Sequence, residues 1–227
     1  MNIQLLKSVD QAGEAQGLAI IIDVFRAFST EAFVFANGAE KIIPVLTLEE
    51  AFALKSENPD YILMGERGGL KVEGFDFGNG PTEVVPVDFS GKTIIHTTSN
   101  GTKGLVNAIH ADAIIVGSFV MAKSIVEYIK AGGFREVSLV STSPYTDMNN
   151  EDILCAQYIK DLLEGVSVDE QQIIADVKAG PVHKFLTGEL HIPISDIDYC
   201  LEFNKFNFII KKVVENGQIV LVKQEVL

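Results

Sequence analysis

Lys92 to Ala108 reads KTIIHTTSNGTKGLVNA, and this stretch decides the fold that the sequence predicts. An apolar run breaks into hydroxyls, an amide and a glycine, and apolar residues then recur at helical spacing, which predicts a strand, a polar turn and a helix. A helix start presents unpaired backbone N–H groups, so the turn is a candidate cradle for an anionic oxygen. An ordinary capped connection between a strand and a helix explains the same residues, and both interpretations stay open for the turn alone.

Strands and helices alternate on both sides of this turn. Continuous apolar runs predict buried strands, and between them lie amphipathic helical patterns. The chain ends in a pattern that alternates around Glu215-Asn216-Gly217 over residues 206–222, which predicts a β-hairpin. We therefore expect an α/β fold of the three-layer α/β/α type, with a largely parallel, mixed sheet and the C-terminal β-hairpin as its antiparallel edge. No linker divides the chain, so residues 1–227 should form a single domain.

Composition excludes several classes of protein. The net charge of −13 argues against binding to nucleic acid, which needs a clustered basic face. No apolar run reaches the roughly 18 residues of a membrane span, and the first residues lack the pattern of a secretion signal. We expect a cytoplasmic protein, with a homodimer as a possible assembly because the chain is rich in apolar residues. Cys155 and Cys200 lack metal-ligand spacing and should be buried thiols.

Polar residues gather where the predicted strands end. In open α/β sheets, ligands bind outside the carboxyl ends of the strands, so these groups could converge on one crevice. A long glycine-rich loop over residues 65–81 adds the carboxylate of Asp76 and the amide of Asn79. Loops of this kind often carry function. The groups at strand ends are Asp23 with Arg26 and Ser29, Glu66 with Arg67, Thr97–Thr102, Ser118, and the residues from Ser141 onward.

The residue types in these clusters suit the chemistry of phosphate. Carboxylates and hydroxyls are ligands for Mg²⁺, which neutralises charge during phosphoryl transfer. Only three arginines occur, and two of them, Arg26 and Arg67, lie in the clusters, where a guanidinium can bind an anionic substrate. A P-loop, an HExxH zinc motif, a GxSxG elbow and a GxGxxG fingerprint are all absent from the sequence.

An ordered set of short segments resembles one known family. The set covers the first two thirds of the chain and is similar, in order and spacing, to the 2-phosphosulfolactate phosphatases of coenzyme M biosynthesis. The resemblance implies a Mg²⁺-dependent hydrolase that converts 2-phospho-3-sulfolactate to 3-sulfolactate and phosphate. Gly80 departs from the family pattern, which usually has serine before the proline. The segments are DVFRAFST (23–30), NGAEKIIPV (37–45), GER (65–67), GFDFGNGP (74–81), TTSNGT (97–102), GSF (117–119) and EDILCA (151–156).

The residues and the resemblance together predict a division of roles. Asp76, Glu66 and Asp23 are the candidates to hold Mg²⁺ or to position water for catalysis. The candidates for binding the small anionic substrate are Arg26, Ser29, Arg67, Asn79, Thr98, Asn100, Gly101, Thr102 and Ser118.

Several alternatives stay open from sequence. Water could attack directly, or a carboxylate could form a phosphoenzyme. Glu151 and Asp152 could join the site or could stabilise the N-terminus of a helix. The substrate could be another small phosphorylated hydroxy acid, or the protein could be a catalytically silent anion-binding protein.

Overall fold

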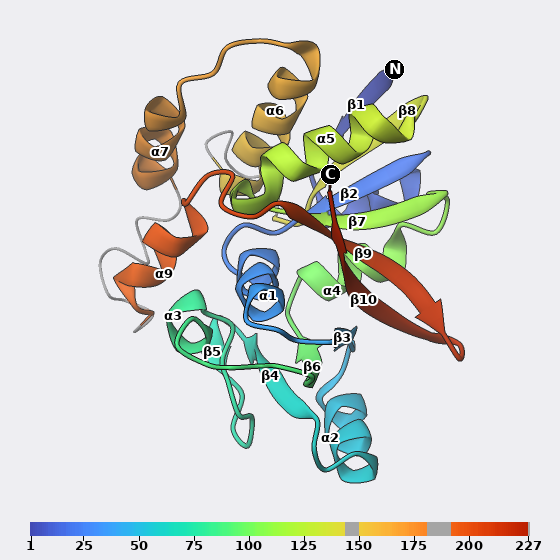
Figure 1. Ribbon diagram of the computed structural model, residues 1–227, viewed down its shortest axis with the longest axis vertical. Coiled ribbons are helices and arrows are strands. Elements are labelled where there is room, and N and C mark those ends of the chain that lie inside the picture. The colour runs from blue at the N-terminus through green and yellow to red at the C-terminus, as the bar shows by residue number, and fades with distance from the viewer. Residues whose placement is uncertain (144–149, 181–191, 227) are drawn as a thin grey trace.

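The computed structural model describes residues 1–143, 150–180 and 192–226, and its core is a ten-stranded mixed sheet (Figure 1). The strand order across the sheet is β1-β8-β2-β7-β9-β10-β3-β6-β4-β5. The α/β class, the largely parallel sheet and the C-terminal hairpin are all confirmed. The strands are β1 (Asn2–Leu6), β2 (Leu18–Ile22), β3 (Lys41–Pro44), β4 (Ile62–Arg67), β5 (Leu70–Lys71), β6 (Thr93–Thr97), β7 (Ala113–Gly117), β8 (Glu136–Ser141), β9 (Phe208–Glu215) and β10 (Gln218–Glu225).

The C-terminal hairpin lies in the middle of the sheet, so the prediction that it forms an edge is wrong. β9 pairs antiparallel with β7, and β10 pairs antiparallel with β3. The hairpin turns at Asn216 and Gly217, which both have positive φ, as a two-residue hairpin turn requires. Phe208, Ile209 and Ile210 are buried in succession, a pattern that suits an interior strand covered on both faces better than an edge strand.

The central hairpin joins two parallel half-sheets. One contains β1, β8, β2 and β7, and the other contains β3, β6 and β4. The successive antiparallel pairs reverse the strand direction between the halves. Residues that follow β2, β4 and β6 nevertheless line one cavity, so the carboxyl ends of both half-sheets meet in a common region.

Helices cover both faces of the sheet, which gives the predicted three layers (Figure 1). On β2, Ile21 faces the helix of Gly104, whereas Ile20 and Ile22 pack on the opposite face near Ile125. The alternation of strand side chains therefore buries both faces of β2. The α-helices are α1 (Ala27–Ala36), α2 (Leu48–Glu57), α3 (Pro81–Val84), α4 (Gly101–Asn107), α5 (Ala122–Gly132), α6 (Glu151–Glu164), α7 (Glu170–Ala179) and α9 (Ile194–Cys200), and the 3₁₀ helices are η1 (Val9–Glu14) and η2 (Phe119–Met121).

Several regions depart from the predicted elements. The loop over residues 65–81 contains the end of β4 and the short strand β5, so it is more regular than its glycine content suggested. The edge strand β1 and helix α9 were not predicted, because neither segment shows a long periodic pattern. The helix expected near residues 181–186 lies outside the described residues. The predicted single domain stays a prediction.

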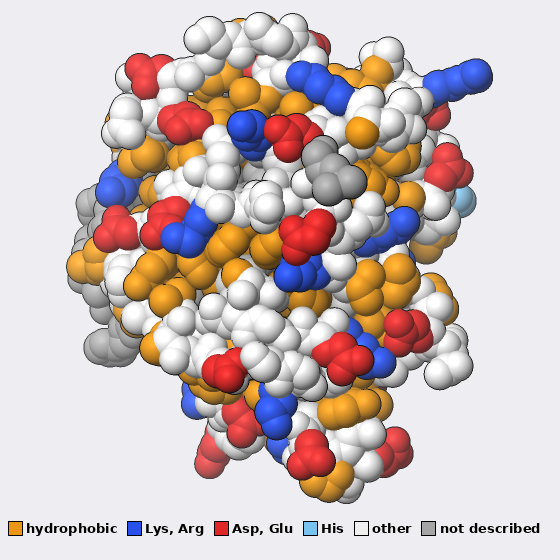
Figure 2. Space-filling view, viewed as in Figure 1, with side chains coloured by type: hydrophobic (Ala, Val, Ile, Leu, Met, Phe, Trp, Pro, Cys, Tyr) orange, Lys and Arg blue, Asp and Glu red, His pale blue; other side chains and the backbone are white. Residues whose placement is uncertain are grey.

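The described surface shows no large patch of one charge on the face drawn in Figure 2. Lys and Arg side chains lie among Asp and Glu side chains there. Within the described ranges, no helix combines the length and the apolar character needed to span a bilayer. Both cysteines are buried free thiols, as predicted.

Candidate active site

A polar cavity of about 280 Å³ lies where β2, β4 and β6 end. It combines the cluster after β2, the loop after β4 and the turn before α4. These segments are far apart in sequence, and the two half-sheets bring them together. The residues that line the cavity are Asp23, Phe25, Arg26, Glu66, Gly68, Gly69, Asn79, Thr98, Ser99 and Asn100.

Asp23 follows β2 and presents a buried carboxylate to this cavity. Its Oδ1 accepts a hydrogen bond of 3.1 Å from the backbone N–H of Ala27 at the start of α1. A Cβ at Gly101 would lie 3.0 Å from Asp23 Oδ2, so the glycine allows the turn before α4 to approach the carboxylate closely. Burial, and then the negative charge of Asp152, raise the pKa of Asp23 to about 8.

Asp152 at the start of α6 lies beside Asp23, away from the cavity lining. Its Oδ1 accepts a bond of 2.8 Å from Val24 N–H, and its Oδ2 accepts bonds from the backbone and hydroxyl of Ser143. Asp152 thus links the loop after β8 to the segment after β2. Burial raises the pKa of Asp152, and burial followed by the charge of Asp152 raises the pKa of Glu151 to about 8. Asp152 therefore holds the segment next to Asp23 without lining the cavity, and both roles expected for Glu151 and Asp152 stay predictions.

Glu66 at the end of β4 connects two walls of the cavity. Its Oε1 accepts a bond of 2.6 Å from Ser99 N–H, and its Oε2 accepts bonds from Ser99 Oγ at 3.1 Å and from Gly69 N–H at 2.7 Å. One carboxylate therefore holds the turn before α4 against the loop after β4. Hydrogen bonds to a charged acceptor of this kind are stronger than neutral ones.

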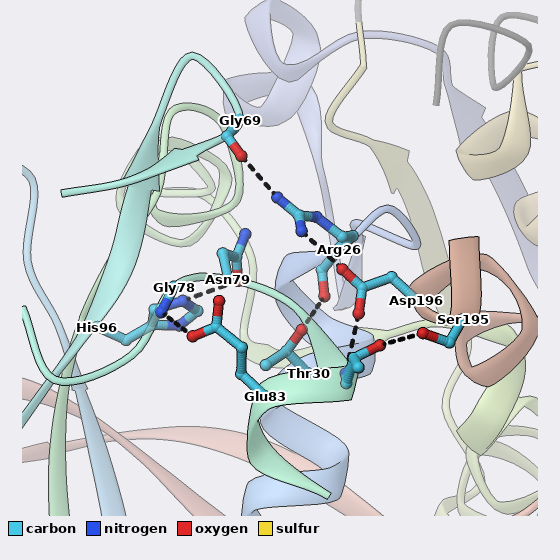
Figure 3. A network of polar contacts seen from close by, with 10 residues as sticks. Arg26, Thr30, Gly69, Gly78, Asn79, Glu83, His96, Ser195 and Asp196 are labelled. Atoms are coloured by element: carbon cyan, nitrogen blue, oxygen red, sulfur yellow. Dashed lines mark hydrogen bonds and ion pairs between the residues drawn. The ribbon is translucent and has the colours of Figure 1, made fainter. Parts of the chain in front are cut away.

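Arg26 is the one cationic side chain in the described lining of the cavity. Its Nη1 forms an ion pair of 2.7 Å with Asp196 Oδ2 of α9, and its Nη2 donates to the carbonyl oxygen of Gly69 at 2.8 Å (Figure 3). Asp196 Oδ1 also accepts from the backbone N–H of Thr82. The guanidinium is fixed from two sides, so its orientation at the cavity is set before any ligand arrives.

Asn79, Thr98 and Asn100 also line the cavity, whereas the other six predicted site residues do not. Two of them make contacts elsewhere. Arg67 donates to the carbonyl oxygens of Glu66 and Leu46 and to Thr97 Oγ1. Asp76 has a side chain that is 45% exposed, lies 3.7 Å from Lys55 Nζ and accepts from Leu63 N–H.

The four other predicted residues are buried but do not line the cavity. The Ser29 hydroxyl donates to the carbonyl oxygen of Val24, and Thr102 N–H donates to Thr98 Oγ1. Gly101 supports the approach to Asp23 described above. The Ser118 hydroxyl is buried without a hydrogen-bond partner in the described part of the chain.

Three residues of the site escaped prediction from sequence. Asp196 is 170 positions from Arg26, and no motif connects them. Both ring nitrogens of His96 are hydrogen-bonded, one of them to Asn79. Glu31, its other partner, lies within an apolar stretch of α1, and its isolated charge was the only signal.

The carboxylates of the cavity fit a hard divalent cation. Across residues 1–143, 150–180 and 192–226, no three His, Cys, Asp or Glu side chains are grouped so that they alone could hold a metal. Mg²⁺, however, commonly uses one or two carboxylates and completes its shell with water and substrate phosphate. Asp23 and Glu66 supply two such ligands. Burial, and then the charge of Asp152, raise the pKa of Asp23, and a bound cation would stabilise its carboxylate form.

The fold and the cavity together define an α/β protein with a buried, acid-lined polar site where its parallel strands end. Residues 4–215 match the family model described as 2-phosphosulpholactate phosphatase. The chain therefore belongs to the 2-phosphosulfolactate phosphatase family, as the resemblance indicated.

Curated relatives carry the same description. The chain is 34% identical to a probable 2-phosphosulfolactate phosphatase of Carboxydothermus hydrogenoformans, and the match covers 97% of each chain. It is 32% identical to a protein of the same description from Bacillus subtilis, over 92% of each chain. A third, from Caldicellulosiruptor saccharolyticus, is 43% identical over 63% of this chain and 61% of its own.

Gly80 offers a test of how the Arg26 ion pair is built. A Cβ at this position would overlap Asp196 Oδ2 and lie 2.9 Å from Arg26 Nη1. Replacing Gly80 with serine should push Asp196 away and lower the unfolding free energy by about 1–3 kcal/mol. Denaturant unfolding measures this, with Gly13→Ser as control because its Cβ would meet only one atom, at 3.7 Å. Equal stability of the two variants would contradict the expected overlap.

Glu151 should make the stability of the metal-free protein depend on pH. Its pKa is raised to about 8 in the folded protein, above the ordinary value of 4.5, so the folded state holds a proton that the unfolded state releases. Folding stability should therefore fall as pH rises from about 4.5 through 8. Relative to Glu151→Gln, the unfolding free energy of the wild type should fall by up to about 1.4 kcal/mol per pH unit in this window.

Unfolding free energies between pH 5 and 9 in the presence of a chelator test this expectation. Glu127→Gln is a suitable control, since that side chain is 47% exposed. If the difference between wild type and Glu151→Gln stays constant with pH, the pKa of Glu151 is not raised.

Proposed function

We propose that this protein is a Mg²⁺-dependent phosphatase that hydrolyses 2-phospho-3-sulfolactate to 3-sulfolactate and phosphate. The observation that carries the proposal is the convergence of Asp23, Glu66 and Arg26 on one cavity in a chain of this family. Two carboxylates and one fixed guanidinium combine ligands for a hard cation with a donor for anionic oxygens. The relatives' description as probable 2-phosphosulfolactate phosphatases supports the choice of substrate.

Asp23 and Glu66 are the residues that would hold Mg²⁺. When bound, the ion would neutralise charge on the phosphoryl oxygens during transfer. Asp23 is placed by Ala27 N–H, and Glu66 by Ser99 and Gly69, so both carboxylates are oriented before substrate binds. Asp76 lies outside the cavity lining, and we assign it no ligand role.

Arg26 and Asn79 would bind the anionic groups of the substrate. A substrate with phosphate, carboxylate and sulfonate groups needs several donors, and the net charge of −13 requires that these be local. Another part of the cavity wall is formed by Thr98, Ser99 and Asn100. Its position depends on the hydrogen bond from Ser99 N–H to Glu66. Arg67 would act through Thr97 and the chain near β4, not by direct contact with substrate.

Phosphate release from a panel of small phosphorylated hydroxy acids, with and without Mg²⁺, tests the proposal. Selective, metal-dependent release from 2-phospho-3-sulfolactate supports it. Preference for a different acid would keep the assignment as a phosphatase but change the proposed substrate. Binding of inorganic phosphate without turnover of any member, at any Mg²⁺ concentration, would instead favour a catalytically silent anion-binding protein.

The predicted cytoplasmic location and possible homodimer belong to the same proposal. Light scattering at working concentration measures the assembly, and a single mass near 24.7 kDa would contradict the dimer.

A further inference from the structure

A buried chain of polar side chains leads from α1 to the cavity by way of His96 on β6. Glu31 on α1 is 2.8 Å from His96 Nδ1, through its Oε1. His96 Nε2 on β6 is 3.1 Å from Asn79 Oδ1, and Asn79 lines the cavity. Relative exposures are 1% for Glu31, 1% for His96 and 5% for Asn79, so water does not orient these groups.

The positions of the acceptors determine where the protons lie. Asn79 Oδ1 can only accept, so the bond to it requires a proton on His96 Nε2. Glu31 Oε1 then shares one further proton with Nδ1, either as a carboxylate with imidazolium or as a carboxylic acid with neutral imidazole. Burial raises the pKa of Glu31, and the hydrogen bond and charge of His96 oppose this shift. Both forms of the pair are neutral overall, and both keep Nε2 protonated.

We propose that Glu31 and His96 are positioning residues that fix the Asn79 amide with its NH₂ group toward the cavity, as a donor to an anionic oxygen of the substrate. Figure 3 shows the Asn79 nitrogen on the side away from His96. This inference deepens the proposed function and rests on it for the identity of the ligand.

An amide without this support could present either of its ends. If Nε2 carried no proton, the Asn79 NH₂ would turn toward it, and the carbonyl oxygen would face the cavity. An oxygen there would repel a phosphate or sulfonate instead of donating to it. The pair thus acts by selecting one of two nearly isosteric orientations.

The cost of burying this pair argues that it does more than fill space. Buried ionisable pairs are often no more stabilising than well-packed apolar side chains of similar volume. Glu31 also leaves its Oε2 buried without a partner in the described residues, an unfavourable arrangement for stability alone. An apolar pair would pack the same space, but it could not orient Asn79.

Two substitutions of His96 separate positioning from packing. In His96→Gln, the side-chain nitrogen can occupy the place of Nε2 and donate to Asn79 Oδ1. In His96→Asn, the side chain reaches only the place of Nδ1, so it can contact Glu31 but not Asn79. Both variants lose the imidazole ring, so both should be destabilised to a similar degree.

We expect His96→Asn to weaken binding of inorganic phosphate about tenfold or more, as loss of a hydrogen bond to a charged ligand does. His96→Gln should stay within about threefold of wild type. Calorimetry at one fixed pH with Mg²⁺ measures this, and KM for the substrate should follow the same order with a smaller change in kcat. Equal weakening in the two variants would overturn the proposal.

The ring ¹⁵N spectrum of His96 in the wild-type protein provides a second test that needs neither variant to fold. A protonated Nε2 is expected, and an unprotonated Nε2 would overturn the proposal. Neither the spectrum nor phosphate binding depends on turnover. A wild-type protein that binds phosphate but hydrolyses no substrate would therefore refute the phosphatase function while leaving the positioning role to be decided by these two measurements.

Discussion

Asp23→Asn should lower kcat/KM for phosphate release by roughly 10²–10⁴-fold, the range typical for loss of an essential carboxylate. The substitution keeps the shape of the side chain and its bond from Ala27 N–H, but it removes the charge that would hold Mg²⁺. Steady-state kinetics over a range of Mg²⁺ concentrations measure the change. The loss should not be recovered at high Mg²⁺, because a neutral amide is a weak ligand for a hard cation.

Asp76→Asn is the matched control, since Asp76 was an equal candidate from sequence but lies outside the cavity lining. It should keep activity within about twofold and stability within about 0.5 kcal/mol of wild type. Stability of Asp23→Asn should be unchanged or higher, because burial disfavours the carboxylate that it replaces. Full activity in Asp23→Asn, or loss in Asp76→Asn alone, would contradict our assignment of the site.

Arg26→Met should abolish substrate binding and also lower the unfolding free energy by about 3–5 kcal/mol. The pair is deeply buried, with exposures of 8% for Arg26 and 1% for Asp196, so the substitution leaves an uncompensated carboxylate in the interior. It also removes the one cationic side chain in the described lining of the cavity. Denaturant unfolding and phosphate binding by calorimetry measure the two effects separately.

The double variant Arg26→Met/Asp196→Asn separates structure from function. The neutral amide can still accept from Thr82 N–H and no longer carries a buried charge, so at least about 1 kcal/mol of the lost stability should return. Phosphate binding should stay lost in both variants. Recovery of phosphate binding together with stability in the double variant would mean that Arg26 only supports the fold. Arg135→Met, which removes an exposed arginine, controls for the loss of a positive charge.

Individual residues of the site differed in how well the sequence predicted them. Asp23, Arg26 and Glu66 line the cavity, as expected of polar residues that follow apolar strand runs, and Asn79 reaches it from the glycine-rich loop. Asp76 and Arg67 met the same criterion, yet Asp76 pairs with Lys55 and Arg67 with Thr97, because a glycine-rich loop gives no indication of which way each side chain turns.

Residues that act through long-range contacts could not be predicted from the sequence. The partner of Arg26 is in α9, and the partners of His96 come from α1 and from the loop before α3. No local pattern records such contacts, since pairs distant in the chain meet only after the elements between them have packed.

Interactions between residues close in sequence determined the class of fold and most of its elements. The apolar run at residues 18–22, the capping box of Thr47 with Glu50 and the Asn216-Gly217 turn each specify their own structure within a few residues. Only the tertiary structure decided that the hairpin lies between two half-sheets, because strand order depends on which apolar faces remain to be covered once both halves form. The packing of the two half-sheets then places Asp23 and Glu66 in one cavity, a consequence of the whole sheet that no single segment contains.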